Sequence, residues 1–376
     1  MKESVKRISM EKVAIIGGGI VGATAAYLIS KNSDYSVTLY DSGKGQATRA
    51  AAGIISPWLS KRRNKKWYAL AKDGATYIAE LAKETQMNSK TYLQSGTIVT
   101  RKESADLDEL ESLANQRKVN APEMGTIKRV DAQEIRTLLP LVTADFQGIF
   151  ISGGARIDGN RFVKHLLEIS ERNGVNLVHS KVELVDDQTI KDESQVKKFD
   201  LILVCAGAGI NELLAPLNYE VQVHPQKGQL IELNVPAYQN DIIAPVLMPE
   251  SEKDFMPIGD GRLIIGATHE NTPGFDLKFT QDALDDLFAS AKRIDNRLSK
   301  DDLIATRVGT RSFTDDFSPF FGWLPNNDHV LVASGLGSSG LTTGPIVAKL
   351  LVSLLESSRD YSKYQKEISN YLHMKG

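Results

Sequence analysis

Glycines near the start of the chain and an aspartate after them have the types and spacing of a dinucleotide-binding site. The run Ile15-Ile-Gly17-Gly-Gly19-Ile-Val-Gly22 contains a G-x-G-x-x-G pattern, and Asp41 follows at the expected distance of about 20 residues. Gly17 would allow a tight turn, Gly19 would let a pyrophosphate approach the backbone, and Gly22 would let a helix pack closely on a strand. Asp41 would bind the ribose hydroxyls of an adenosine. The pattern therefore predicts a dinucleotide cofactor.

The segments around these residues support this prediction. Residues 13–16 form a short apolar run typical of a buried strand, residues 23–29 continue as a helix, and residues 36–40 alternate like a second strand. The alternative is a membrane span, because residues 13–29 carry almost no charge. That stretch is slightly short for a bilayer, contains four glycines and leads directly into a βαβ pattern. We therefore expect no transmembrane segment.

A second glycine-rich turn, residues 335–342, lies near the other end of the chain. Nicotinamide enzymes usually need one glycine fingerprint, whereas a flavin ring also needs binding groups far from its adenosine half. The positive end of a helix stabilises the electron-rich edge of a reduced flavin, so this turn favours flavin. A plain helix cap is the alternative, because Ser and Thr often cap helices. The spacing Gly337-Ser-Ser-Gly340 does not fit the G-x-S-x-G elbow of hydrolases.

The composition indicates a globular protein of ordinary polarity. Of 376 residues, 41% are hydrophobic and 24% are charged, and the formal net charge of −2 gives no general attraction to nucleic acid. The lone Cys205 excludes an internal disulfide and suits a reducing compartment. Residues 1–12 lack the apolar core of a secretion signal, so we expect a cytoplasmic protein. The six histidines have no metal-binding spacing, so we expect no metal site.

Two further segments have weaker signals. The run 61–67 is strongly basic and could contact RNA, but such a run is more often a solvated face, so we expect no nucleic-acid partner. His269 follows an apolar run and is interpreted as a polar residue at a strand exit, although it could lie near the site.

Together, the motifs form an ordered set that spans nearly the whole chain. In this set the chain resembles the FAD-dependent D-amino acid oxidase superfamily, and within it the glycine oxidases. The matching segments are residues 15–22, 47–54, 204–208, 259–268, 308–311 with Asp316 and Pro319, and 335–342.

The resemblance implies FAD, and we expect it to be bound non-covalently because Cys205 follows a buried apolar run. Gly17, Gly19 and Asp41 would contact the ADP half, as would Ala206 and Gly207, and Val182 would meet the adenine. The remaining contacts would come from Thr48, Arg49, Ala52, Gly53 and Ile54 along the phosphates and flavin, and from Gly337, Ser338, Ser339, Gly340, Leu341 and Thr342 at the ring.

The resemblance also implies a substrate and a mechanism. Arg311 matches the arginine that anchors the substrate carboxylate in this family, and a guanidinium can bind a carboxylate through two parallel hydrogen bonds. From its position alone, a structural role for this arginine is the alternative. A small amino acid (glycine, sarcosine or a D-amino acid) held in this way would transfer a hydride from Cα to flavin N5. The resulting imine would be hydrolysed to a keto acid, so the resemblance implies an oxidoreductase.

Asp254 departs from the family pattern. Many members have at this position a tyrosine that contacts the substrate carboxylate, and a carboxylate cannot donate to another carboxylate unless it is protonated. One hypothesis is that Asp254 faces the substrate amine or a basic side chain, and that the substrate is not simply glycine. The alternative is a solvated aspartate at a shifted strand end.

Two other functions stay open. A flavoenzyme that oxidises 2-hydroxy acids would need the same arginine and also a base for the hydroxyl proton. An RNA-associated flavin module is the other alternative. The motifs identify neither the electron acceptor, oxygen or a quinone, nor the oligomeric state, and a homo-oligomer is compatible with them.

The elements that would position these residues give an α/β fold. We predict a discontinuous Rossmann-like FAD-binding domain at 10–60, 150–215 and 318–376, with an inserted β-rich α+β substrate-binding domain at 61–149 and 216–317. Segments 43–57 and 335–340 should be loops, and the patterns predict helices at 67–85, 104–117, 160–173, 281–298 and 343–356, and strands at 199–205, 228–233, 241–248, 262–267 and 329–334.

Overall fold

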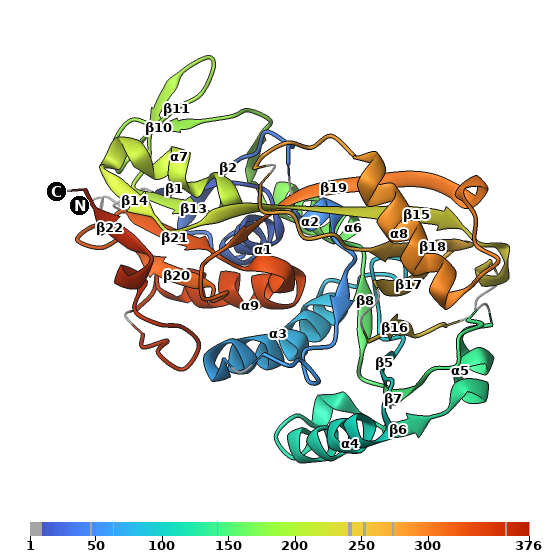
Figure 1. Ribbon diagram of the computed structural model, residues 1–376. Helices are drawn as coiled ribbons and strands as arrows, with labels where there is room; N and C mark the ends of the chain where they lie inside the picture. Colours follow the sequence, from blue (N-terminus) through green and yellow to red (C-terminus); the bar gives the residue numbers. More distant parts are fainter. Residues whose placement is uncertain are drawn as a thin grey trace, which may run out of the picture.

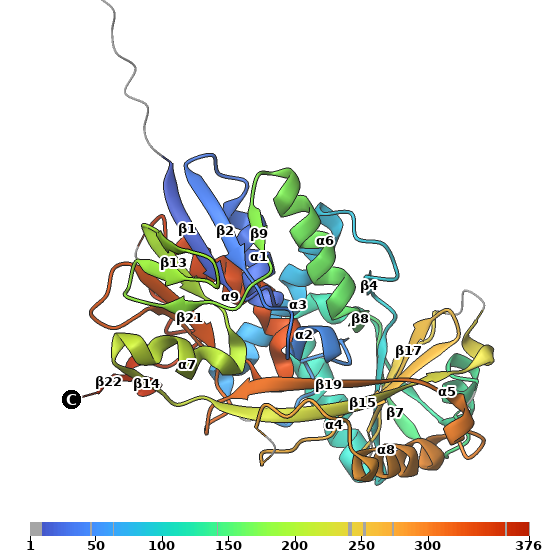
Figure 2. The same cartoon turned by 90° about the horizontal axis from the view of Figure 1, so that it is seen from above.

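Figure 1 shows the computed structural model of the chain, which describes residues 10–45, 47–62, 64–140, 142–239, 243–250, 253–272, 274–357 and 359–375. The described strands form two large sheets and three small ones. Figures 1 and 2 show two long strands, β15 (His224–Asn234) and β19 (Leu303–Phe313), which extend from one large sheet toward the other.

The first large sheet carries the N-terminal glycine motif near its centre. Its strand order is β20-β21-β13-β1-β2-β9, and its neighbouring strands run parallel except for the antiparallel pair β20 and β21. The strands come from distant parts of the chain: β1 (Glu11–Ile16), β2 (Tyr35–Tyr40), β9 (Asn176–Val178), β13 (Leu201–Val204), β20 (Phe320–Trp323) and β21 (Val330–Ser334). Since β1 lies between two parallel neighbours, residues on both of its faces are buried, which explains its unbroken apolar run.

Helices cover one face of this sheet. Helices α1 (Ile20–Ile29) and α9 (Gly340–Ser353) contact its strands and each other, α6 (Gly159–Arg172) packs against α1, and α3 (Lys65–Glu84) packs against α9. Val13 and Ile15 belong to this core, whereas Ala14 and Ile16 face a second core that includes α7 (Ile210–Leu214). Asn64 starts α3 by accepting a hydrogen bond from the backbone of the first turn, as N-cap residues do.

The second large sheet has the order β19-β15-β18-β17-β16-β5-β7-β6. Besides β15 and β19 it contains β5 (Thr97–Arg101), β6 (Ile127–Val130), β7 (Gln147–Ile151), β16 (Val246–Met248), β17 (Asp254–Gly259) and β18 (Arg262–Gly266). Helix α8 (Gln281–Ile294) covers one face, where Leu287 packs in the same core as Ile231 and Ile265. Leu230 and Met256 belong to a separate core on the other face, which faces the cavity described below.

The remaining elements are short or peripheral. One small sheet, β3-β8-β4, follows helix α2 (Ala47–Ala50), and the others are β10-β11-β12 and β14-β22. Their bounds are β3 (Ile54–Ile55), β4 (Tyr92–Leu93), β8 (Ala155–Ile157), β10 (Glu183–Leu184), β11 (Thr189–Lys191), β12 (Val196–Lys198), β14 (Tyr219–Val221) and β22 (Leu372–Met374), with helices α4 (Ser104–Lys118) and α5 (Ala132–Leu138) at the edge of the second sheet.

The α/β class predicted from the sequence is confirmed, and several element boundaries are corrected. Segment 43–57 is not only a loop, because it contains α2 and β3. The helix predicted to reach 298 ends at Ile294, since Asp295 adopts an extended backbone and its carboxylate contacts Arg297. In the segment predicted as a strand at 241–248, only β16 is strand, and residues 241–242 lie outside the described part of the chain. The division into two domains stays a prediction, and no described helix is long and apolar enough to cross a membrane.

Candidate active site

A cavity of about 690 Å³ brings together segments from both large sheets. It is lined by the turn after β1, the ends of β2 and β13, residues of β15, β17 and β19, and the turn before α9. Most of the predicted site residues line it: Gly17, Gly19, Asp41, Thr48, Ala52, Gly53, Ile54, Val182, Ala206, Gly207, Asp254, Arg311, Gly337, Ser338, Ser339, Gly340, Leu341 and Thr342.

Gly22 and Arg49 are the two predicted site residues that do not line this cavity. A Cβ atom on Gly22 would lie 1.8 Å from the carbonyl oxygen of Gly17, so only glycine lets α1 pack this closely on the preceding turn. The guanidinium of Arg49 lies 3.7 Å from the carboxylate of Asp41. Gly22 therefore shapes the turn, and Arg49 lies beside the lining residue Asp41.

At the turn after β1, backbone groups are exposed to the cavity. Gly17 has a φ of +102°, and a Cβ atom there would lie 2.5 Å from the carbonyl oxygen of Cys205. Helix α1 begins without a side-chain cap or an acidic residue in its first turn. Ile20 N donates to Thr48 Oγ1 at 3.0 Å, which fixes the lining residue Thr48 beside this helix start. The positive end of α1 thus suits an anion such as a pyrophosphate.

The second glycine-rich turn contributes another helix start to the cavity. Gly340, Leu341 and Thr342 form the first turn of α9 and line the cavity, and no side chain caps this helix. The hydroxyl of Ser339 instead accepts a hydrogen bond from Trp67 Nε1 at 2.9 Å. A serine side-chain cap, the plainer interpretation of this turn, is therefore wrong. The uncapped helix start suits an electron-rich ring edge.

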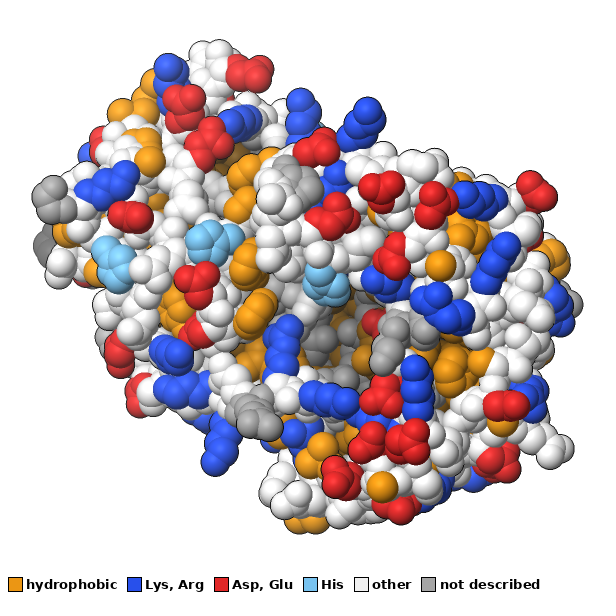
Figure 3. Space-filling view, in the orientation of Figure 1, with side chains coloured by type: hydrophobic (Ala, Val, Ile, Leu, Met, Phe, Trp, Pro, Cys, Tyr) orange, Lys and Arg blue, Asp and Glu red, His pale blue; other side chains and the backbone are white. Residues whose placement is uncertain are grey.

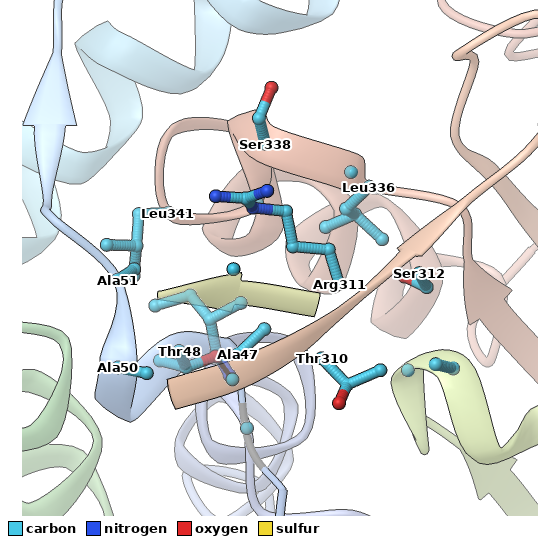
Figure 4. Close-up of a pocket in the computed structure, with 18 of the residues that line it drawn as sticks. Ala47, Thr48, Ala50, Ala51, Thr310, Arg311, Ser312, Leu336, Ser338 and Leu341 are labelled. Carbon is cyan, nitrogen blue, oxygen red and sulfur yellow. Dashed lines mark hydrogen bonds between the residues drawn. The ribbon is translucent and has the colours of Figure 1, made fainter. Parts of the chain in front are cut away.

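Arg311 projects from β19 into the cavity, as Figure 4 shows. Its Nη1 donates to Gln226 Oε1 and to the carbonyl oxygen of Thr268, both at 3.1 Å. A Cβ atom on Gly228 would lie 2.6 Å from Nη2, so glycine on β15 leaves room for the guanidinium. Burial lowers the pKa of Arg311 to about 10, and the nearby charge of Glu270 opposes this effect. The guanidinium is therefore held in place and charged near neutral pH, and it makes no ion pair with a described residue.

Asp254 lies on the same face of the second sheet as Arg311. Across the sheet, Asp254 on β17 lies opposite Gly266 on β18, and Gly266 lies opposite Leu230 on β15. Four residues before Leu230 on the same strand, Gln226 lies opposite Arg311 on β19. Residues directly opposite in neighbouring strands share a face, as do residues an even number apart. Burial raises the pKa of Asp254 to about 7. Asp254 is half-buried, and within the described part of the chain its carboxyl group has no hydrogen bond or ion pair. Whether it faces the substrate or water stays a prediction.

The structure adds three cavity residues that the sequence did not assign. Arg62 was assigned to a solvated basic face, but it is half-buried, donates to Ser338 Oγ at 2.9 Å and lies 4.6 Å from the ring centre of Trp67. The basic run was the available signal, although it does not tell which of its residues turns inward. His269 also lines the cavity, and burial lowers its pKa to about 4. Thr310 also lines the cavity, and its Oγ1 is buried without a hydrogen-bond partner among the described residues.

The sequence predicted no metal site and no covalent bond between the protein and its cofactor. Among the residues that the structure describes, no group of three or more His, Cys, Asp or Glu side chains is placed to hold a metal ion. Cys205 lines the cavity, and burial raises the pKa of its thiol to about 12. A thiol that stays protonated is a poor nucleophile, which supports the prediction of non-covalent cofactor binding.

Comparisons with known proteins agree over nearly the full length of the chain. A family model described as FAD dependent oxidoreductase matches residues 12–354. The chain is 35% identical over 366 residues to the uncharacterized oxidoreductase YurR of Bacillus subtilis (strain 168), covering 94% of this chain and 98% of the relative. It is 28% identical over 359 residues to a glycine oxidase of Pseudomonas aeruginosa, covering 92% and 94%. The crystal structure of iminodiacetate oxidase (IdaA) from Chelativorans sp. BNC1 matches with a TM-score of 0.88 and 32% identity, covering 96% and 98%.

Proposed function

The chain belongs to the family of FAD-dependent oxidoreductases, and on that premise we propose that it oxidises the C–N bond of a small amino acid. The observation that carries this proposal is Arg311, a half-buried guanidinium in the cavity that makes no ion pair with a described residue. A buried cation without a carboxylate partner is costly unless a ligand supplies one. The carboxylate of an amino acid has the charge and the planar shape that this side chain binds best.

The cavity fits FAD along its length. The uncapped start of α1 and the backbone at Gly17 and Gly19 would hold the pyrophosphate, and Asp41 would hold the ribose. The uncapped start of α9 would face the flavin ring. Bound FAD would supply the acceptor for the hydride that leaves the substrate carbon.

The side chains of this cavity would orient the substrate and remove its proton. Arg311 would fix the carboxylate and thereby direct the Cα–H bond. An amine must be neutral for its lone pair to assist departure of the hydride, so the ammonium form has to lose a proton first. Asp254, with a pKa near 7, would accept that proton from the substrate nitrogen. The oxidised substrate would be an imine, which water converts to a carbonyl compound and ammonia or an amine.

Several substrates satisfy these requirements. Glycine, sarcosine and D-amino acids have the needed carboxylate and nitrogen, and iminodiacetate joins them because the relative of known structure is described as its oxidase. A 2-hydroxy acid is the second candidate, because Asp254 could also serve as the base that a hydroxyl proton requires. The RNA-associated alternative loses part of its basis, since Arg62 of the basic run lines the cavity.

The proposal is tested by anaerobic titration of the flavin. We expect the purified protein to be yellow and its absorption near 450 nm to bleach with an amino acid but not with a hydroxy acid. Arg311→Lys should bind FAD normally but require a much higher substrate concentration. Arg307→Lys is the matched control, because Arg307 lies on the same strand, pairs with Glu232 and does not line the cavity. A flavin that no amino acid reduces would overturn the proposal.

A further inference from the structure

Arg62 places a second guanidinium in the wall of the cavity, and no carboxylate among the described residues forms an ion pair with it. Its Nη2 donates to Ser338 Oγ at 2.9 Å, and its guanidinium lies 4.6 Å from the ring centre of Trp67. A guanidinium has more N–H donors than this one contact uses. Arg62 forms no ion pair with any described residue, and burial lowers its pKa. A half-buried cation of this kind is well suited to an anionic ligand.

Arg62 and Arg311 reach the same part of the cavity. Figure 4 shows Arg311 extending from β19 toward the turn that carries Ser338, and Ser338 is the residue to which Arg62 donates. The charges of Arg311, Lys253 and Arg62 all lower the pKa of His269, so the three cations lie within electrostatic range of one imidazole. In Figure 3, Lys and Arg side chains stand around a hollow in this face of the molecule, with several Asp and Glu side chains along its lower rim.

Within the described part of the chain, the nearby acids form no ion pair with Arg62 or Arg311, and Glu270 acts on Arg311 through its charge alone. A hollow of about 460 Å³ adjoins the cavity and shares Arg62, His269 and Ser338 with it. The carboxylate of Asp316 in this hollow accepts hydrogen bonds from Lys366, Tyr371 and Thr314. Glu270 accepts hydrogen bonds from Gln229 and Thr268. Among the described carboxyl groups in this part of the cavity, Asp254 is the one without a hydrogen-bond partner, and it could therefore contact a substrate.

We propose that the substrate carries two carboxylates and one amine, and that Arg62 binds the carboxylate that Arg311 does not. This inference rests on the proposed function and narrows its substrate class. Arg62 and Arg311 make no ion pair with a described residue and would bind the two carboxylates, whereas Lys253 is already paired with Asp286. Asp254 would face the amine. The second carboxylate can belong to a second carboxymethyl group on the nitrogen, as in iminodiacetate, or to the side chain, as in D-aspartate.

The test compares substrates with one and two carboxylates in the FAD-loaded enzyme. Iminodiacetate and D-aspartate are the dicarboxylates, and sarcosine and glycine are the monocarboxylates. Arg62→Gln should lower kcat/KM for the preferred dicarboxylate about 10- to 100-fold, as expected when a hydrogen bond between charged groups is lost, and change the monocarboxylates less than about threefold. Arg62→Lys, which keeps the charge, should recover part of the loss. Lys61→Gln is the control, because Lys61 is exposed and pairs with Glu250 outside the cavity.

A binding measurement separates this inference from the proposed function. Oxydiacetate has the two carboxylates of iminodiacetate but an ether oxygen in place of the nitrogen, and methoxyacetate has only one. Oxydiacetate should raise the melting temperature of the wild type more than methoxyacetate does, and Arg62→Gln should abolish the difference. If no amine reduces the flavin but this pattern holds, only the proposed function fails. The second carboxylate site is wrong if amines reduce the flavin and Arg62→Gln lowers kcat/KM equally for both substrate classes. It is also wrong if oxydiacetate and methoxyacetate raise the melting temperature of the wild type equally.

Discussion

Replacing Asp254 with Asn should stabilise the protein, and the gain should grow with pH. Burial raises the pKa of this carboxyl from 3.8 to about 7. The folded chain therefore keeps a proton that the unfolded chain releases above about pH 4, so the wild type loses stability as pH rises from there to about 7. Each pKa unit is worth about 1.4 kcal/mol, which gives a penalty of about 2 kcal/mol at pH 5 and at most about 4 kcal/mol at pH 8. Asn is close in shape and carries no charge, so it should remove this penalty.

Denaturation of the FAD-loaded wild type and Asp254→Asn at pH 5 and pH 8 measures the effect. The difference in unfolding free energy between the two proteins should be about twice as large at the higher pH. Asp260→Asn is the matched control, because Asp260 lies at the turn of the same β17–β18 hairpin, is exposed and pairs with Lys90 at 2.7 Å. The control should show no gain that increases with pH. A gain for Asp254→Asn that is equal at both pH values, or a loss, would refute the conclusion that partial burial raises the pKa of Asp254.

Four other outcomes follow from the geometry of the cavity. If Asp254 takes the proton from the substrate nitrogen, kcat/KM should rise through a pKa near 7, and this limb should vanish in Asp254→Asn; a wild-type profile without the limb would contradict that role. Arg311→Lys should lower kcat/KM about 10- to 100-fold with an unchanged flavin spectrum, and unaltered kinetics would remove Arg311 from the substrate site. Gly22→Ala should reduce the FAD content, read as the ratio of absorption at 450 and 280 nm, because its Cβ would lie 1.8 Å from the Gly17 oxygen; full occupancy would show that α1 can shift without harm. His269→Gln should leave the shape of the pH profile between 6 and 8 unchanged, because the imidazole has a pKa of about 4, and a lost inflection would show that it titrates there.

The cofactor end of the cavity could be predicted because its chemistry depends on local sequence. Gly17 and Gly19 occupy one tight turn, and Asp41 follows at the end of the next strand. Backbone conformation and strand length fix such positions within one βαβ unit, so residue types and spacing suffice to find them. The family likeness, the fold class and the cofactor are confirmed by the comparisons.

The substrate end could be predicted only in part, because it depends on contacts between distant segments. Strand β19 was not predicted as a strand, since its polar residues line a cavity and break the alternation that identifies strands. Asp254 lines the cavity because β17, β18 and β15 pair side by side, and this pairing between distant segments cannot be deduced from a local sequence pattern. Arg62 stands in a run of similar residues, and only the packing of Trp67 and the turn at Ser338 distinguishes it from exposed Lys61.

The dispersed origin of the first large sheet has a consequence for protein synthesis. Strand β13 pairs with β1 on one side and with β21 on the other, and β21 begins only at Val330. A ribosome therefore releases the glycine turn long before it releases the strand and helix that complete the same layer. Until then, the growing polypeptide carries an open strand edge at β13, a surface that invites unwanted pairing. Nascent chains halted before Val330 should consequently bind chaperones and remain colourless, whatever flavin is supplied.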